Sequence, residues 1–155
     1  MANANTGCCS RARKLGKEDP GRSGGIACIG PGGQDVQVYK LDNTDRDVYE
    51  KLQEFVEQAE FAFLEKVHSM PKQGVASTFK FGVSFGFLQG ILIASGIPFE
   101  LVTPQKWQGY LGCRTKGDKN VTKARAQELF PDVKCTHAIS DSLLIAEYGR
   151  RVRGE

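Results

Sequence analysis

Three acidic residues stand where a folded chain normally places other side chains. Asp19 lies in an Asp-Pro-Gly segment directly before a short apolar run, Glu65 follows Phe-Ala-Phe-Leu, and Asp141 lies in a mostly apolar run near the predicted start of the last helix. A carboxylate in apolar surroundings costs free energy unless it is paired, protonated or bound to a metal. Brought together, the three would offer Mg²⁺ the hard oxygen ligands that it prefers. Two such ions about 4 Å apart would activate a water and stabilise the leaving oxygen in phosphodiester hydrolysis.

Each of these acids also has a simpler explanation. Asp-Pro-Gly is a common turn, so Asp19 can be a turn residue. Glu65 can pair with a lysine at the end of its strand. Asp141 suits the first turn of a helix, where the helix macrodipole favours negative charge. Spacing alone therefore leaves a metal site and three unrelated carboxylates both open.

The elements that must position these acids alternate between strands and helices. The apolar run 24–30, the turn Pro-Gly-Gly-Gln and the alternating run 36–41 predict a β-hairpin. Apolar spacing further predicts strands over 61–67 and 98–103, helices over 45–59, 75–95, 122–130 and 139–151, and a short helix that begins at Thr103-Pro104. Strands that alternate with helices indicate an α/β fold with a partly parallel sheet.

The long helix predicted over 75–95 carries a glycine every four residues, at Gly82, Gly86 and Gly90. These glycines share one face and would allow close backbone approach to another helix, a sheet or a second subunit. Its apolar stretch 81–97 is shorter than the roughly 20 residues of a membrane span. We therefore expect a buried, glycine-rich helix and no membrane contact.

Composition limits the remaining possibilities. The chain has 155 residues, of which 40% are hydrophobic and 25% charged, and this excludes a wholly disordered or collagen-like chain. Its five cysteines form no CxxC pair, and although Cys113, Cys135 and His137 could supply three zinc ligands, their spacing fits no standard zinc site. Reduced thiols and the absence of an apolar core in the first fifteen residues predict a cytoplasmic protein.

The net charge of +3 is small, but the basic residues are not evenly spread. Six of them and a single acid, Asp118, lie between residues 104 and 125, and 112–120 is predicted to be a flexible basic loop. Basic and amide side chains near an acidic metal site are suited to a nucleic-acid backbone. The predicted contacts are Lys66, His68, Lys72, Gln73, Lys80, Lys106, Arg114, Lys116, Lys119 and Lys123.

Several of these motifs, in this order, resemble the RuvC family of Holliday-junction resolvases, with its phage and bacterial RuvC-like branch the most similar. The resemblance spans about residues 16–151. It rests on Asp-Pro-Gly-Arg-Ser-Gly-Gly-Ile-Ala (19–27), Phe-Leu-Glu-Lys-Val (63–67), Val-Thr-Pro-Gln-Lys-Trp (102–107) and Ile-Ser-Asp-Ser-Leu-Leu-Ile-Ala-Glu-Tyr-Gly-Arg-Arg (139–151).

The resemblance implies a ribonuclease-H-like mixed sheet, with an antiparallel hairpin followed by parallel strands and flanked by helices. It further implies a homodimeric, Mg²⁺-dependent crossover junction endodeoxyribonuclease that acts in DNA recombination and repair. Such an enzyme makes paired nicks in a four-way DNA junction with two Mg²⁺ per active site, for which Mn²⁺ substitutes. Asp19, Glu65 and Asp141 match the family's acids. Residues 1–15 would then be a flexible basic tail and 16–155 the nuclease domain.

Two features depart from the family pattern. Many members have an acid or a histidine three residues before the last Asp, where this chain has Ala138. His137 stands four residues before Asp141, on the same helix face, so we expect it to be the fourth catalytic and metal-binding residue. The segment 14–18, which precedes Asp19, has Leu15 as its one apolar residue, although the family has an apolar strand there.

These departures keep other functions open. A catalytically impaired protein of the same fold would bind junctions without nicking them. A ribonuclease-H-type nuclease would prefer an RNA–DNA hybrid. The long glycine-faced helix is the expected dimer contact.

Overall fold

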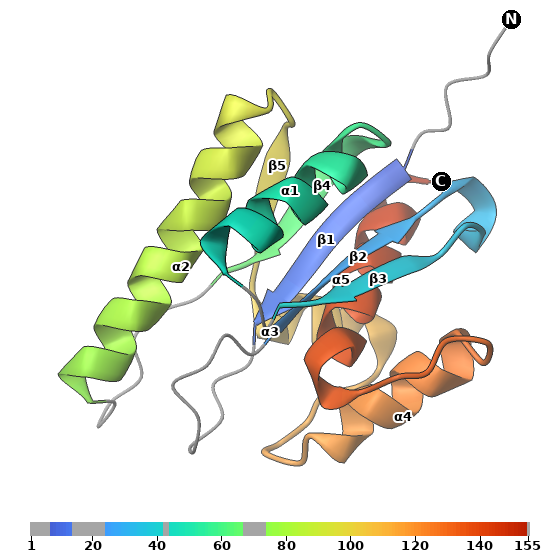
Figure 1. Ribbon diagram of the computed structural model, residues 1–155. Helices are drawn as coiled ribbons and strands as arrows, with labels where there is room; N and C mark the ends of the chain where they lie inside the picture. Colours follow the sequence, from blue (N-terminus) through green and yellow to red (C-terminus); the bar gives the residue numbers. More distant parts are fainter. Residues whose placement is uncertain (1–6, 14–23, 42–43, 67–73, 155) are drawn as a thin grey trace, which may run out of the picture.

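The computed structural model describes residues 7–13, 24–41, 44–66 and 74–154 (Figure 1). Within these residues a mixed sheet has the strand order β3-β2-β1-β4-β5, and helices cover both of its faces. The strands are β1 (Gly7–Arg13), β2 (Gly24–Ile29), β3 (Gln37–Lys40), β4 (Ala59–Glu65) and β5 (Phe99–Val102). The helices are α1 (Asp45–Val56), α2 (Val75–Ala94), α3 (Pro104–Leu111), α4 (Asn120–Leu129) and α5 (His137–Arg153), with a 3₁₀ turn at Pro31–Gly33.

The predicted α/β fold class is confirmed. β1, β2 and β3 form an antiparallel meander, whereas β4 pairs in parallel with both β1 and β5. The predicted helices and the β2–β3 hairpin are all present within a few residues of their expected bounds. Local signals explain this agreement. Thr44, for example, caps α1 in a reciprocal capping box with Asp47.

The middle strand differs from the prediction. The sequence predicts a flexible tail over residues 1–15, whereas the structure forms β1 from Gly7–Arg13. Residues 14–18 lie outside the described residues. Gly-Cys-Cys-Ser-Arg-Ala-Arg shows no apolar alternation, so its own propensity does not predict a strand. Pairing with β2 on one side and β4 on the other supplies the hydrogen bonds that define it.

The two faces of the sheet carry separate cores. α1 and α2 cover one face, where Ile26, Cys28 and Ala62 pack against Leu52 and Leu88. α3, α4 and α5 cover the other face (Figure 1), whose core is a cluster of buried residues from both strands and helices. Its members include Ala27, Ile29, Phe63, Val102, Trp107, Leu111, Leu143, Leu144 and Ile145. α5 contacts four of the strands and lies between α3 and α4.

The expectation that the glycine-rich helix is buried is wrong for most of α2. Its buried residues are Phe81, Leu88, Ile91 and Leu92, all on the side that faces the sheet. At 3.6 residues per turn, the opposite side is an apolar stripe with open space around its glycines among the described residues. We call it the outward stripe; it consists of Val75, Phe79, Gly82, Val83, Gly86, Gly90 and Ile93, all exposed.

By length and composition alone, α2 is the one helix in the described part of the chain that could cross a membrane. One such helix is weak evidence for a span. The helix was expected to be covered because its residues are apolar. Apolar composition predicts that a helix is covered but does not say by what.

Candidate active site

Glu65 is the last residue of β4, and its side chain is buried, with 7% exposed. Its Oε1 accepts a hydrogen bond from the indole Nε1 of Trp107 at 3.1 Å. Its backbone pairs with Val102 of β5, and the next amide, that of Lys66, donates to the Val102 carbonyl at 2.7 Å. The predicted acid in an apolar strand is therefore held from two sides at the carboxyl end of the parallel strands.

Asp141 lies on α5 and is also buried, with 8% exposed. The sequence predicts it in the first helical turn, but α5 begins earlier, at His137 after the cap Thr136, so Asp141 lies in the second turn. A macrodipole preference of the first turn therefore does not explain an acid at this position. Neighbouring hydroxyls are bonded within the helix, because Ser140 donates to the Thr136 carbonyl at 2.6 Å and Ser142 to that of Ile139 at 2.8 Å.

A glycine at the start of β2 fixes the position of α5. A Cβ at Gly25 would lie 2.8 Å from the carbonyl oxygen of Ala138 and 2.8 Å from Oγ of Ser142. Real Cβ atoms do not approach other atoms so closely, so glycine is what permits this contact. The turn of α5 that carries Asp141 therefore lies directly against the first residues of β2.

The strand register shows that Glu65 and Asp141 lie at the same edge of the sheet. Ala12 of β1 pairs with Gly25 and directly follows Arg11, which pairs with Leu64. Continued by one residue, this register places Glu65 opposite Ala12, so Gly25 and Glu65 lie in the same row two strands apart, with about 10 Å between their backbones. Gly25 is two residues from Ala27, and Glu65 is two residues from Phe63. Residues two apart in a strand share a face, and Ala27 and Phe63 belong to the core beneath α5, so Gly25 and Glu65 lie on that face. α5 brings Asp141 to the same corner, at the carboxyl ends of β1 and β4 (Figure 1).

The other two predicted ligands have different outcomes. Asp19 lies outside the described residues. The residues on either side of its segment, Arg13 and Gly24, pair with each other at this same edge. His137 is exposed and is the first residue of α5, one turn before Asp141. The two side chains share a helix face, as their spacing predicts.

The donor chemistry of this corner fits a divalent hard cation. Both acids carry carboxylate oxygens, and both are buried although charged groups resist burial. Within the described residues, no group of three or more His, Cys, Asp or Glu side chains is close enough together to hold a metal ion. Glu65, His137 and Asp141 therefore do not form such a group by themselves, and the fourth predicted ligand, Asp19, lies outside the described residues.

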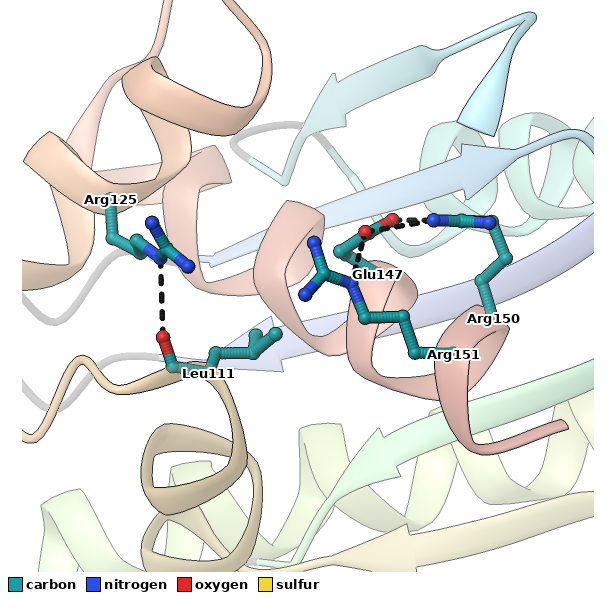
Figure 2. Close-up of polar contacts among 5 residues, drawn as sticks. All are labelled: Leu111, Arg125, Glu147, Arg150 and Arg151. Carbon is teal, nitrogen blue, oxygen red and sulfur yellow. Dashed lines mark hydrogen bonds and ion pairs between the residues drawn. The ribbon is translucent and has the colours of Figure 1, made fainter. Parts of the chain in front are cut away.

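The segment between α3 and α4 begins beside Asp141. Burial raises the pKa of the Cys113 thiol to about 11, while the positive charge of Arg125 lowers it and the negative charge of Asp141 raises it. Arg125 donates from Nε to the Leu111 carbonyl at 3.2 Å (Figure 2) and pairs through Nη1 with Glu128 at 2.7 Å. Cys113 is therefore a neutral thiol at neutral pH, and the base of the predicted basic loop is tied to the helices beside Asp141.

The predicted phosphate contacts are in different situations. Lys66 follows Glu65 directly and is exposed. Lys106 pairs with Glu100 at 3.0 Å and lies over the Tyr148 ring, 6.0 Å from its centroid, so it already has partners within the chain. His68, Lys72 and Gln73 lie outside the described residues. The remaining predicted contacts are exposed: Lys80, Arg114, Lys116, Lys119 and Lys123.

Two residues at this corner were not predicted to have a site role. The sequence places Trp107 on a short helix but gives no sign that it reaches Glu65, 42 residues earlier. Gly25 was taken only as part of a hairpin strand. The one available signal was the position of the chain's single tryptophan one turn after a Thr-Pro helix start.

The order of strands and the placement of helices define a mixed α/β fold of the ribonuclease-H-like kind. No family model and no curated protein matches the chain. Among solved structures, that of Thermus thermophilus RuvC superposes with a TM-score of 0.63 and 12% identity over 96% of both chains. T. thermophilus RuvC in complex with a Holliday junction substrate gives a TM-score of 0.62 and 13% identity, over 96% of this chain and 95% of that one. The chain thus has the RuvC-like fold, and the predicted resemblance is confirmed at the level of fold.

Proposed function

We propose that the protein is a Mg²⁺-dependent endonuclease that makes paired nicks in four-way DNA junctions. The observation that carries the proposal is the placement of Glu65 and Asp141, far apart in sequence, buried and on the same face at the carboxyl edge of the sheet. The fold supports it, since one similar structure is of a RuvC bound to a Holliday junction substrate.

Each residue of the site has a distinct task in this proposal. Glu65 and Asp141 hold the cation, together with Asp19 from the segment that connects β1 to β2. His137, one turn before Asp141 and exposed, acts as a fourth ligand or accepts a proton from the attacking water. Bound Mg²⁺ would supply positive charge to activate a water and stabilise the leaving oxygen of the phosphodiester.

The basic side chains around this corner bind the phosphate backbone. Lys66 adjoins Glu65, and the segment that starts at Cys113 brings Arg114 and Lys116 outward from beside Asp141. Each phosphate contact releases counterions, so affinity for DNA falls as salt rises. The pairing of Lys106 with Glu100 makes it the weakest of the predicted contacts.

The outward stripe of α2 binds a second copy of the chain. Its exposed apolar residues, among them Phe79 at 71% and Ile93 at 68%, form the kind of surface that proteins cover with a partner. Glycines four residues apart let two such helices approach closely. A two-fold dimer would carry two active sites, one for each nicked strand.

Nicking assays on three labelled substrates test the proposed activity: a synthetic four-way junction, a linear duplex and an RNA–DNA hybrid, each with Mg²⁺ or a chelator. We expect Mg²⁺-dependent nicks in two opposed strands of the junction and little cleavage of the others. Glu65→Gln should abolish nicking, whereas Glu60→Gln, an exposed acid on the same strand, should not.

Other outcomes identify the alternatives. Tight junction binding without nicking by the wild-type protein would indicate a catalytically impaired binding protein and contradict the proposal. Faster cleavage of the hybrid than of the junction would indicate a ribonuclease-H-type enzyme instead.

A further inference from the structure

A buried hydrogen bond joins the chain's single tryptophan to Glu65. Trp107 has none of its surface exposed, and its Nε1 lies 3.1 Å from Oε1 of Glu65. The indole N–H can only donate. Hydrogen bonds to a charged acceptor are stronger than those between neutral groups.

The local sequence places this donor precisely relative to the strand end. Val102 pairs with Glu65 across β4 and β5, and Thr103 immediately caps α3 by accepting from the Lys106 amide at 3.3 Å. Pro104 starts the helix with a favourable φ. Trp107 follows one turn later, and helical side chains lean toward the N-terminus, so its ring extends back over the end of β5.

The ring cannot easily move from this position. It belongs to the core beneath α5, with Phe63 of β4 and Leu111 of its own helix in the same cluster of buried side chains. Interiors are close-packed, so a large buried ring has few alternative rotamers. The N–H therefore presents a fixed donor to the carboxylate.

A core role alone does not require this acceptor. A buried tryptophan needs some hydrogen-bond partner, and a backbone carbonyl would satisfy it. Here the acceptor is instead the acid that ends β4 at the candidate active site. An ionised carboxylate has about four acceptor positions, and the indole N–H takes one of them.

We propose that Trp107 is a positioning residue that orients the Glu65 carboxylate for cation binding. This rests on the proposed function, in which Glu65 holds a divalent cation. Groups that orient metal ligands from behind commonly change metal affinity or activity 10–100-fold when removed. Trp107 does not touch the cation or the DNA in this proposal, so its loss should change metal dependence and leave junction affinity unchanged.

The first experiment compares cation binding by calorimetry with Mn²⁺ as the probe. Trp107→Phe retains an aromatic ring but removes the N–H donor, and we expect Mn²⁺ affinity to fall about 10-fold. Phe130→Leu is the matched control, because it trims an aromatic ring of the same core cluster at the end of α4, a helix that packs on α5. It should bind Mn²⁺ as the wild-type protein does. Both variants should bind a four-way junction with normal affinity when a chelator has removed divalent metal.

The second experiment needs no substitution at Trp107 and so does not depend on whether that variant folds. The single tryptophan gives a single indole N–H resonance in a ¹H–¹⁵N spectrum. We expect Mg²⁺ to shift this resonance in the wild-type protein and to leave it in place in Glu65→Gln.

The outcomes separate this proposal from the one on which it rests. Binding of Mn²⁺ by the wild-type protein but not by Glu65→Gln supports the metal site. If, in that case, Trp107→Phe binds Mn²⁺ as tightly as wild type, or the indole resonance does not shift with Mg²⁺, the positioning role is wrong and the metal site is still supported. If wild-type protein itself fails to bind Mn²⁺, the proposed function fails, and the positioning role fails with it.

Discussion

The two long helices of the protein invert the usual relation between composition and burial. α2 is mostly apolar, yet four of its twenty residues are buried. α5 carries Ser140, Asp141, Ser142 and Glu147, yet every residue from Ile139 to Gly149 is buried. α2 packs with one side on the sheet and leaves its other side uncovered, whereas α5 contacts the sheet, α3 and α4 (Figure 1).

The difference indicates which helix serves which purpose. Burying polar groups costs free energy, so their presence in α5 points to chemistry or to specific pairing. Exposing apolar groups leaves favourable burial unused, so their presence along α2 points to a partner. Substitutions on α5 and on α2 test these two inferences.

The largest expected effect follows the replacement of Asp141 by Asn, which removes a charge and leaves the shape of α5 unchanged. Loss of a carboxylate that holds the cation should remove several kcal/mol of transition-state stabilisation, or about three orders of magnitude in nicking rate. Single-turnover cleavage of a four-way junction measures it. Glu147→Gln, on the same helix and equally buried, is the control and should nick normally at neutral pH. A similar loss in both variants would mean that Asp141 acts through stability alone.

The next largest effect concerns the outward stripe of α2. A side chain at Gly86 meets no described atom within 4 Å of its Cβ, so Gly86→Arg should leave the single subunit folded. It should convert a dimer to a monomer, because a long charged side chain would lie in the close helix contact. Sedimentation velocity measures the change. Ser77→Arg, exposed on the opposite side of α2, should remain dimeric. A wild-type protein that sediments as a monomer would contradict the proposal that the outward stripe binds a second copy of the chain.

A smaller effect is expected from Gly25→Ala, which tests the contact that holds α5 against β2. The added Cβ would meet the Ala138 carbonyl, and overpacking of this kind costs about 1–3 kcal/mol. Denaturant unfolding should show this loss, and the nicking rate should fall because Asp141 moves with its helix. Gly74→Ala, where the space around the Cβ is open, should nick normally and lose only the small N-cap preference of glycine over alanine. Unchanged stability in Gly25→Ala would indicate that α5 can shift away from β2 at little cost in free energy.

The smallest effect concerns Glu147, which pairs with Arg150 at 2.9 Å and Arg151 at 2.6 Å (Figure 2). Burial raises the pKa of this carboxyl, but the hydrogen bonds and charges of the two arginines outweigh it and leave the pKa below the usual 4.5. A depressed pKa stabilises the fold above about pH 4.5, and this contribution is lost as the pH falls through the folded-state value.

We therefore expect Glu147→Gln to lower the free energy of unfolding by about 1–2 kcal/mol at pH 7, since both arginines are partly exposed. The difference from wild type should shrink below pH 4.5. Denaturant unfolding at several pH values measures it, and a difference that is constant with pH would exclude a role of the charge.

The sequence predicted what local signals encode. The capping box of α1, the turn of the β2–β3 hairpin and the apolar run that ends at Glu65 all depend on residues close together in the chain. It also predicted Asp141 as a candidate, because an acid in an apolar helix is conspicuous. Strand β1 was missed because its cysteines, serine and arginines show no alternation, and only pairing with distant strands defines it.

Other features depend on contacts that no local pattern encodes. The bond from Trp107 to Glu65 joins residues 42 positions apart, and the glycine at position 25 matters only because α5 packs against it. The exposure of α2 was also missed. Its apolar composition predicts that it is covered, but whether the cover comes from the same chain depends on the tertiary arrangement.

The central claim is that Glu65 and Asp141 hold one divalent cation together. Crystals grown or soaked with Mn²⁺ and measured at a wavelength where manganese scatters anomalously test it most directly. We predict an anomalous peak that lies within the roughly 2.0–2.2 Å ligand distance of a small hard cation from carboxylate oxygens of both residues. An ordered site in which the two carboxylates face apart, with no peak between them at saturating Mn²⁺, would contradict it.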